Sequence, residues 1–344
     1  MAELPSELTS LVSLADFELA AEKRTTPAVW ARIQGGAADE ITLRWNKEAW
    51  QDMRLRPRVL VDVSEIDTRV NILGCALRFP ILLAPVGAQT WIHPDGDLVA
   101  AAGAEEAEAL YVISSSASVR VEEISHSCKG PTWFQLYVQR DREFTRDLVQ
   151  RAEDSGCRAL CVTVDSPCHG IRDREQRTKR DLPARELPNF AGPDYLDPTL
   201  TWKDIEWLLS FARTPVLLKG ILDADDAEAG VERGAAGIVV SNHGGRNLDT
   251  SPATAHALAS IVDRVAGRGA VVVDGGIRRG TDVLKALALG ANAVQIGRPY
   301  LHGLAIAGAA GVAQVVRLLH RELELAMMLC GRRTIPSIDR SVLW

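Results

Sequence analysis

The chain has 344 residues, of which 47% are hydrophobic and 24% are charged, and its formal net charge is -6. This length is enough for a large core, in either two domains or one α/β barrel. The acidic balance argues against a nucleic-acid partner, because domains that bind nucleic acids usually carry a basic face.

The sequence predicts a cytoplasmic protein without a membrane span or a metal site. No apolar stretch is expected to reach the roughly 18–20 residues that cross a bilayer. The first ten residues, MAELPSELTS, are polar and acidic, unlike a signal peptide. The six cysteines form no CxxC pair and no cluster with zinc-ligand spacing, so we expect all of them to be reduced and mostly buried.

Residues 1–79 precede the regular part of the chain, and their helix-like start (14–34) and the stretch 56–67 predict a cap on that regular part. From residue 80 onward, eight short runs rich in Val, Ile and Leu are typical of buried parallel strands. They are residues 80–85, 109–115, 133–138, 158–164, 215–220, 236–242, 270–276 and 292–299. Helix-like segments lie between them, at residues 97–109, 142–156, 223–234 and 281–290. Asp223 is the expected N-cap of the third, and Thr281 with Asp282 the expected start of the fourth.

Eight strands alternating with helices over roughly 250 residues predict a (β/α)8 TIM barrel. A doubly wound sheet is the alternative, but it would leave the last two strands unexplained. We expect one domain over residues 1–344, with an N-terminal helical cap in 1–79, the barrel in 80–310 and a C-terminal helix and tail in 311–344. The apolar stretch 311–329 could pack in the barrel wall or between subunits.

The interval between the fourth and fifth strands is the longest in the barrel. It contains residues 172–198, which are charged and rich in proline. These residues could form a solvated surface loop, but the loops that follow barrel strands surround the catalytic face. We therefore expect an active-site lid.

Polar and charged residues follow six successive strands at their C-terminal ends, where barrels carry their chemistry. They are Gln135, Tyr137, Thr163, Asp165, Lys219, Ser241, His243, Arg246, Asp274, Arg278 and Arg298. One such residue has an ordinary explanation, since a single His or Lys after a strand is usually a loop residue. Six successive strand ends of this kind favour a functional site.

The last two strands are followed by DGGIRRG (274–280) and GRP (297–299). Barrels often bind phosphate with these two loops, because glycines let backbone N–H groups approach an anion and arginines donate to its oxygens. Lys219, Gln135, Thr163 and Ser114 at neighbouring strand ends would suit a flavin ring across the barrel mouth. The pattern therefore favours FMN over a phosphorylated substrate.

The chain resembles the FMN-dependent L-2-hydroxy acid oxidases and dehydrogenases, a family that includes glycolate oxidase and lactate oxidase. The resemblance extends from about residue 17 to about residue 340. It rests on SNHGGRNLD (241–249), DGGIRRGTDVLKALALGA (274–291), GRP (297–299), FQLYV (134–138), TVDSP (163–167) and LLKG (217–220).

The resemblance implies that His243 is the general base, paired with Asp165, in the oxidation of a 2-hydroxy acid by transfer of a hydride equivalent to flavin N5. Arg246 and Arg172 would hold the substrate carboxylate, and Tyr137 would contact its hydroxyl or carboxylate. Lys219 would lie at flavin N1–O2. The other implied FMN contacts are Val86, Gly87, Ser114, Gln135, Thr163, Ser241, Asp274, Gly275, Gly276, Arg278, Gly297 and Arg298. A homotetramer is also implied, with oxygen or another electron acceptor reoxidising the flavin.

The chain departs from the family pattern near the substrate. The family's first helix usually carries a tyrosine that binds the substrate carboxylate, and an ungapped alignment places Phe17 there, which removes a hydrogen bond of about 0.5–1.5 kcal/mol. Ser116 stands where glycolate oxidase has a tryptophan, and the loop after the fourth strand is shorter. These differences predict a wider, more apolar pocket and an aromatic or long-chain substrate larger than glycolate. Gly87 stands at a position where relatives have Ala or Gly, and the glycine slightly favours an enzyme whose reduced flavin reacts weakly with oxygen.

Two other functions are compatible with the phosphate-binding loops. An FMN barrel with isomerase chemistry would not need His243, Arg246 and Arg172 together. A non-catalytic flavin-binding module would tolerate loss of the base, whereas His243 and Asp165 are both present.

Overall fold

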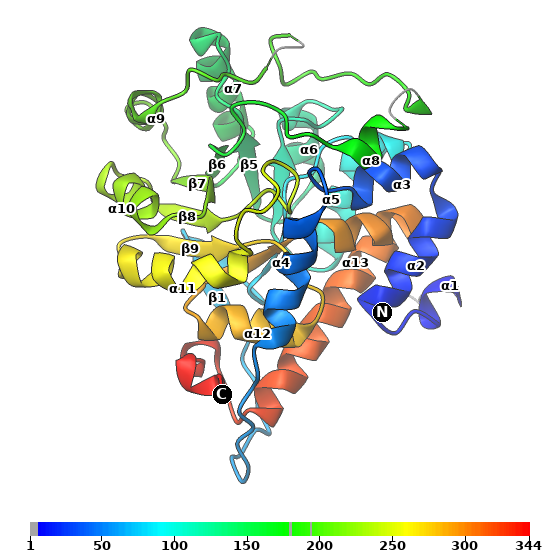
Figure 1. The fold of residues 1–344 in the computed structure, drawn as a ribbon, viewed down its shortest axis with the longest axis vertical. Coiled ribbons are helices and arrows are strands. Elements are labelled where there is room, and N and C mark those ends of the chain that lie inside the picture. Colours follow the sequence, from blue (N-terminus) through cyan, green and yellow to red (C-terminus); the bar gives the residue numbers. More distant parts are fainter. Residues whose placement is uncertain (1–5, 179–180, 193–194) are drawn as a thin grey trace.

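The computed structural model describes residues 6–178, 181–192 and 195–344. Its centre is a closed barrel of eight parallel strands, in which β10 pairs with β3 to complete the ring (Figure 1). The strands are β3 (Ile81–Leu83), β4 (Tyr111–Ser114), β5 (Thr132–Leu136), β6 (Leu160–Thr163), β7 (Val216–Ile221), β8 (Gly237–Val240), β9 (Ala270–Val273) and β10 (Ala293–Ile296). Each coincides with one of the predicted apolar runs, so the (β/α)8 prediction is confirmed.

Helices follow the strands and surround the barrel (Figure 1). They are α5 (Gly96–Glu106), α6 (Val121–Ser127), α7 (Arg142–Asp154), α9 (Trp202–Leu209), α10 (Ala224–Glu232), α11 (Thr254–Val265), α12 (Gly280–Ala288) and α13 (Arg298–Leu329). The short elements η1 (Gln89–Trp91) and α8 (Asp173–Gln176) lie in loops, and η3 (Ile335–Ser337) and η4 (Arg340–Val342) end the chain.

Two helix starts test the capping predictions. Asp223 caps α10 as expected, since its side chain accepts from the N–H of Asp225 at 2.8 Å. Thr281 does not start α12, which already begins at Gly280. Asp282 instead accepts from the N–H groups of Arg278 and Arg279, at 2.9 and 3.0 Å, and so ties the helix to the preceding loop.

The N-terminal segment forms α1 (Ser6–Thr9), α2 (Leu14–Arg24), α3 (Pro27–Gln34) and α4 (Ile41–Asp52). The helix-like stretch 14–34 is two helices because the Thr26 side chain caps a new helix, accepting from the N–H of Val29 at 3.3 Å, and Pro27 occupies its first position. A hairpin of β1 (Val70–Ile72) and β2 (Cys75–Leu77) comes next in the chain, and its buried residues pack with the inward-facing residues of the barrel.

Side chains alternate between the two faces of each strand, which fixes what the barrel interior contains. The inward apolar layer consists of Leu82, Val112, Trp133, Cys161, Leu217, Val239, Val272 and Ala293. Two residues further along seven of these strands, the inward positions are polar and buried: Ser114, Gln135, Thr163, Lys219, Ser241, Asp274 and Gln295. The pleat therefore gathers a polar layer at the C-terminal end of the barrel.

Helix α13 corrects the expectation that no segment is long and apolar enough to span a membrane. Among the described residues it passes that test by length and composition, with a mean hydropathy of 1.4 in its most apolar window. Of that window, 56% is buried inside the protein, and α13 packs against α2, α5 and α12. It bends at Ala307 and Gly308, where the backbone leaves the helical conformation. A buried core helix of this kind meets the same criteria as a membrane span.

The cysteine prediction is also confirmed in the structure. All six cysteines are free, and all except Cys168 are buried.

Gly276 offers a test of how tightly the N-terminal segment packs on the barrel. Its φ is 82°, and a Cβ there would lie 1.8 Å from the carbonyl oxygen of Asn46 on α4. Gly234 has a φ of 100° but open space around the Cβ position. The left-handed backbone alone costs a side chain about 1–3 kcal/mol. We expect Gly276→Ala to lower Tm in calorimetry distinctly more than Gly234→Ala, and equal losses would contradict this close approach.

Candidate active site

A cleft opens at the C-terminal ends of the strands, with about 1350 Å³ of empty space including its mouth. All but three of the predicted site residues line it: Val86, Gly87, Ser114, Gln135, Tyr137, Thr163, Arg172, Lys219, His243, Arg246, Asp274, Gly275, Gly276, Arg278, Gly297 and Arg298. Asp165 and Ser241 lie directly behind its wall, bonded to lining residues, and Phe17 lies elsewhere. The sequence motifs therefore converge on one cleft, although the role of each residue stays a prediction.

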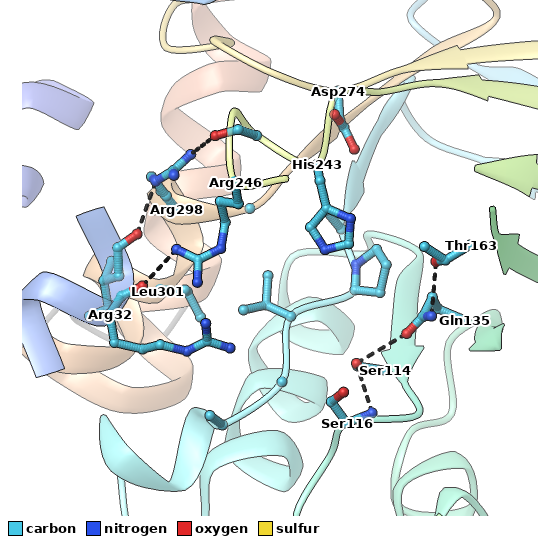
Figure 2. Close-up of a pocket in the computed structure, with 18 of the residues that line it drawn as sticks. Arg32, Ser114, Ser116, Gln135, Thr163, His243, Arg246, Asp274, Arg298 and Leu301 are labelled. Atoms are coloured by element: carbon cyan, nitrogen blue, oxygen red, sulfur yellow. Dashed lines mark hydrogen bonds between the residues drawn. The ribbon is translucent and has the colours of Figure 1, made fainter. Parts of the chain in front are cut away.

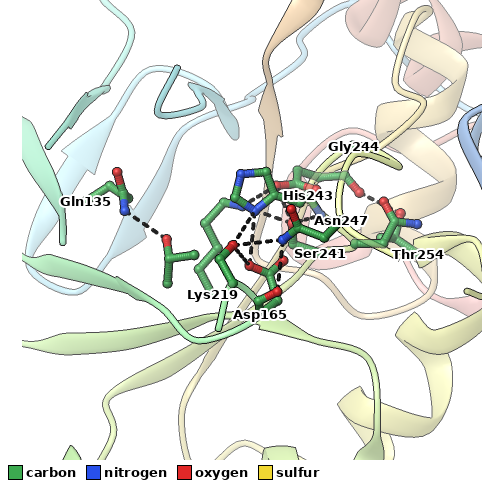
Figure 3. A network of polar contacts seen from close by, with 12 residues as sticks. Gln135, Asp165, Lys219, Ser241, His243, Gly244, Asn247 and Thr254 are labelled. Atoms are coloured by element: carbon green, nitrogen blue, oxygen red, sulfur yellow. Dashed lines mark hydrogen bonds and ion pairs between the residues drawn. The ribbon is translucent and has the colours of Figure 1, made fainter. Parts of the chain in front are cut away.

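His243 and Asp165 form a half-buried pair beside the cleft (Figure 3). The Nδ1 atom of His243 lies 3.0 Å from Oδ1 of Asp165, which also accepts from the Ser166 hydroxyl at 3.0 Å. With Nδ1 facing Asp165, Nε2 has no hydrogen-bond partner among the described residues. His243 itself has a φ of 58°, a left-handed conformation that is rare for a non-glycine residue and marks functional sites.

Burial and charge act in opposite directions on this pair. Burial lowers the pKa of His243, and the Asp165 carboxylate partly offsets this effect. For Asp165, burial opposes ionisation, but the attraction and hydrogen bond of His243 hold its pKa below the usual range. The pair therefore rests at neutral pH as a neutral imidazole beside a carboxylate.

A second buried network reaches the cleft through Lys219 and Asp274 (Figure 3 labels Lys219 and Ser241). The Lys219 ammonium donates to the Ser241 hydroxyl at 3.0 Å and lies 3.3 Å from Oδ2 of Asp274, and Ser241 donates to the same oxygen at 2.8 Å. Burial lowers the pKa of Lys219, but Asp274 and Asp165 outweigh it and raise the pKa above its ordinary value. Lys219 is therefore a fixed cation facing the cleft.

Arg298 and Arg278, from the two loops predicted to bind phosphate, differ in the contacts that hold their side chains. Arg298 donates to three backbone carbonyls, those of Ile33, Gly244 and Gly35, at 2.9 to 3.0 Å (Figure 2). Burial and the nearby Arg278 lower its pKa to about 10, so it stays charged at neutral pH. Among the described residues, the Arg278 side chain donates only to the carbonyl of its neighbour Ile277, and its buried Nε has no hydrogen-bond partner. A Glu18 carboxylate oxygen lies 3.8 Å from that Nε.

A chain of polar side chains crosses the opposite end of the floor (Figure 2). Gln135 donates to the Thr163 hydroxyl at 2.9 Å, and its carbonyl oxygen accepts from Ser114 at 3.2 Å. Gln295 joins this floor but was not predicted, although its place two residues after inward-facing Ala293 was visible in NAVQIG. Both polar atoms of its side-chain amide are buried and unpartnered among the described residues.

These unpartnered atoms test whether FMN fits the cleft. Buried polar groups normally have hydrogen-bond partners, yet within the described chain Oδ1 of Asp274, Nε of Arg278 and the Gln295 amide have none. All three residues line the cleft. A ligand with polar groups along its length is needed, and FMN has a pyrimidine edge, ribityl hydroxyls and a phosphate. The residues present fit the cofactor.

Arg172 and Arg246 lie above the floor, beside Glu175. Arg246 donates to the carbonyls of Arg32 and Gly35, at 3.0 and 2.8 Å, and to Glu175 at 3.0 Å. Arg172 donates to the carbonyl of Arg246 at 3.1 Å, so the two guanidinium groups are fixed relative to each other.

Tyr137 lies on the same side of the cleft. Burial, with the charge of Asp165, raises the pKa of Tyr137 to about 12, so its hydroxyl stays protonated and can donate.

The structure corrects the expectation for Phe17. This residue is fully buried in the hydrophobic core and does not line the cleft. Helix α3 borders the cleft instead, with Val29, Arg32 and Ile33. The break between α2 and α3 at Pro27 is the physical reason, because an ungapped alignment takes no account of such a break.

The expected apolar pocket is also corrected. The space beside Ser116 contains Arg185, which donates to the Ser116 carbonyl at 2.6 Å, and Arg32 lies across the same cleft. Arg185, Tyr195 and Leu196 come from the loop that was expected to form a lid, and they line the mouth. Residues 179–180 and 193–194 of that loop lie outside the described residues, and its movement stays a prediction.

Helix α4 holds the loop that carries His243, a contact that sequence reasoning missed. The side-chain amides of Asn46 and Asn242 donate to each other at 2.9 and 2.8 Å, and Asn242 also accepts from the N–H of Gly245. Neither asparagine carries a sequence signal of this pairing, because the two lie far apart in the chain.

Comparisons with known proteins show to which family the chain belongs. Residues 21–344 match the family described as FMN-dependent dehydrogenase. A peroxisomal (S)-2-hydroxy-acid oxidase of Oryza sativa subsp. japonica is 45% identical, covering 96% of this chain and 95% of the relative. An L-lactate oxidase of Nostoc sp. is 43% identical, covering 98% and 99%. A crystal structure of mandelate oxidase with (S)-2-phenylpropionate superposes with a TM-score of 0.91 at 42% identity, covering 97% and 98%. The chain belongs to the FMN-dependent dehydrogenase family, and its cofactor is FMN.

Proposed function

We propose that this protein oxidises an L-2-hydroxy acid larger than glycolate to the 2-oxo acid, with His243 as the base. The observation that carries the proposal is the His243–Asp165 pair, which faces the cleft that also contains Arg172 and Arg246. The names of the relatives, which are oxidases of 2-hydroxy acids, lactate and mandelate, support the reaction class.

In this proposal, the chain supplies binding and proton transfer. Arg172 and Arg246 bind the substrate carboxylate, because planar guanidinium groups match its two oxygens and fix its plane. Tyr137 donates to the hydroxyl or the carboxylate. Nε2 of His243 then accepts the hydroxyl proton, and Asp165 stabilises the imidazolium that forms.

FMN, when bound, would supply the acceptor for the hydride equivalent, that is, the hydrogen of the substrate's α-carbon with its electron pair. We propose that Lys219 stabilises the negative charge of the reduced ring and that Arg278 and Arg298 hold the phosphate. The remaining contacts in the proposal are Val86, Gly87, Ser114, Gln135, Thr163, Ser241, Asp274, Gly275, Gly276 and Gly297. The buried and unpartnered atoms of Asp274 and Arg278 support these roles.

The surroundings of the reaction are proposed from the sequence. We propose a cytoplasmic homotetramer that acts on a small molecule, with neither a nucleic-acid nor a membrane partner and with no metal. Oxygen or another acceptor reoxidises the flavin.

Asp165→Asn tests the base. Because Asp165 raises the pKa of His243, its loss lowers that pKa, and the acidic limb of the rate profile moves to lower pH. The imidazolium also loses its counter-charge, so flavin reduction slows by about 10²–10⁴-fold. Anaerobic stopped-flow reduction across pH measures both effects. Ser166→Ala removes a donor to Asp165 and an acceptor for Asn247 but leaves the carboxylate in place, so it is the control with a smaller effect. An unchanged rate in Asp165→Asn would contradict the role.

Arg278→Met tests the phosphate site. A charge-assisted hydrogen bond contributes about 1.5–3 kcal/mol, so we expect the Kd for FMN to rise about 10- to 100-fold. Fluorescence titration of the apoprotein with FMN measures it. Arg279→Met is the matched control, because Arg279 is adjacent but pairs with Glu322 at 3.0 Å. If the two variants bound FMN with equal affinity, Arg278 would have no role in binding the phosphate.

The acceptor is tested by mixing the reduced protein with oxygen. A Cβ at Gly87 would lie 2.4 Å from that of Ser116, so the chain cannot carry the alanine found in some relatives without displacing Ser116. Because a glycine at this position favours weak use of oxygen, we expect oxygen to reoxidise the reduced flavin more slowly than an artificial dye does. Faster reoxidation by oxygen would identify an oxidase.

A further inference from the structure

Two arginines that the sequence motifs did not mark share the cleft with Arg172 and Arg246. Arg32 comes from α3, and Arg185 comes from the loop between β6 and α9. Figure 2 shows the Arg32 side chain extending toward the cleft from the same side as Arg246. Burial, followed by the charge of Arg32, lowers the pKa of Arg172, Arg185 and Arg246 alike. The four guanidinium groups therefore form one electrostatic cluster.

One carboxylate serves most of this cluster. Glu175 lies 3.2 Å from Arg32, 3.0 Å from Arg246 and 3.9 Å from Arg172. No carboxylate of the described residues lies within ion-pair distance of Arg185, and Asp97 acts on it only at longer range. A single substrate carboxylate would leave positive charge in excess among these half-buried guanidinium groups, and a cleft lined by charges of one sign attracts ligands of the opposite sign.

Arg185 is held in place without being neutralised. Its guanidinium lies 5.3 Å from the ring centre of Trp91 and donates to the Ser116 carbonyl at 2.6 Å. Trp91 in turn donates to the carbonyl of Pro183, which fixes the segment that carries Arg185. Ser116 lies close to Gly87, and Gly87, Ser116 and Arg185 all line the same cleft.

We propose that the substrate is a 2-hydroxy acid with a second carboxylate, and that Arg185, assisted by Arg32, binds that carboxylate. This inference rests on the proposed function and narrows it. Arg172 and Arg246 take the carboxylate next to the hydroxyl, and Arg185 offers its free donors to the distal one. An aromatic or aliphatic side chain in the same place would bury Arg185 without a counter-charge, which disfavours such substrates.

The test compares substrates that differ in charge but hardly in shape. L-Malate and L-2-hydroxyisocaproate are suitable, because an isopropyl group replaces the distal carboxylate, and L-2-hydroxyglutarate extends the spacing. We expect anaerobic flavin reduction by at least one of the dicarboxylates to be at least about 10-fold more efficient than by L-2-hydroxyisocaproate. The Arg185→Gln variant is expected to raise the apparent Kd of that dicarboxylate about 10- to 100-fold, as for a charge-assisted hydrogen bond, and to leave that of L-2-hydroxyisocaproate unchanged or lower.

Two further variants keep the test specific. Arg185→Lys retains the charge and is expected to restore part of the preference, which separates charge from folding. Arg174→Gln is the control, because Arg174 pairs with Glu40 away from the cleft. Preference for L-2-hydroxyisocaproate in the parent protein, or equal effects of Arg185→Gln on both substrate types, would overturn the inference while leaving the proposed function intact. A protein that binds FMN but is reduced by none of these acids, nor by glycolate, lactate or mandelate, would overturn the proposed function itself.

Discussion

The pleat of eight parallel strands is the constraint on which the rest of the site depends. Because inward positions recur every second residue, the apolar layer of Cys161 and Leu217 is followed at once by Thr163 and Lys219. The apolar layer excludes water from below, and this strengthens every electrostatic interaction above it. A shift of one residue in any strand would turn its polar group outward into the helices, so the register that builds the core also builds the site.

The charged side chains above this layer differ in how they are paired. Lys219 forms an ion pair with Asp274. Burial lowers the pKa of His243, and Asp165 partly offsets this effect. The arginine cluster at the mouth is different, since it has more cations than carboxylates. Incompletely paired polar networks are costly in a low-dielectric site, and in our proposal the excess positive charge attracts the substrate's second carboxylate.

The sequence was informative wherever function coincides with regular structure. The strands, the phosphate-binding loops and the set around His243 follow from periodicity and motifs, because strand ends are fixed by the fold. Arg185 could not be found in this way, since it lies in an irregular loop whose position depends on contacts such as that of Trp91. Arg32 was missed for another reason. The break at Thr26–Pro27 divides the expected helix into α2 and α3, and a single sequence does not show which of the two helices borders the cleft. The alternation of side chains along β10 could have predicted the inward position of Gln295, but a single glutamine inside a strand belongs to no recognised motif.

The reciprocal amide contact between Asn46 and Asn242 has a consequence for how this enzyme is assembled. The loop that carries His243 is held by a helix that precedes every strand of the barrel, and Arg298 is tied to carbonyls from α3. The catalytic rim is thus held by contacts between the N-terminal helices and loops of the second half of the barrel. The helices that precede β3 therefore belong to the catalytic unit as much as the strands do.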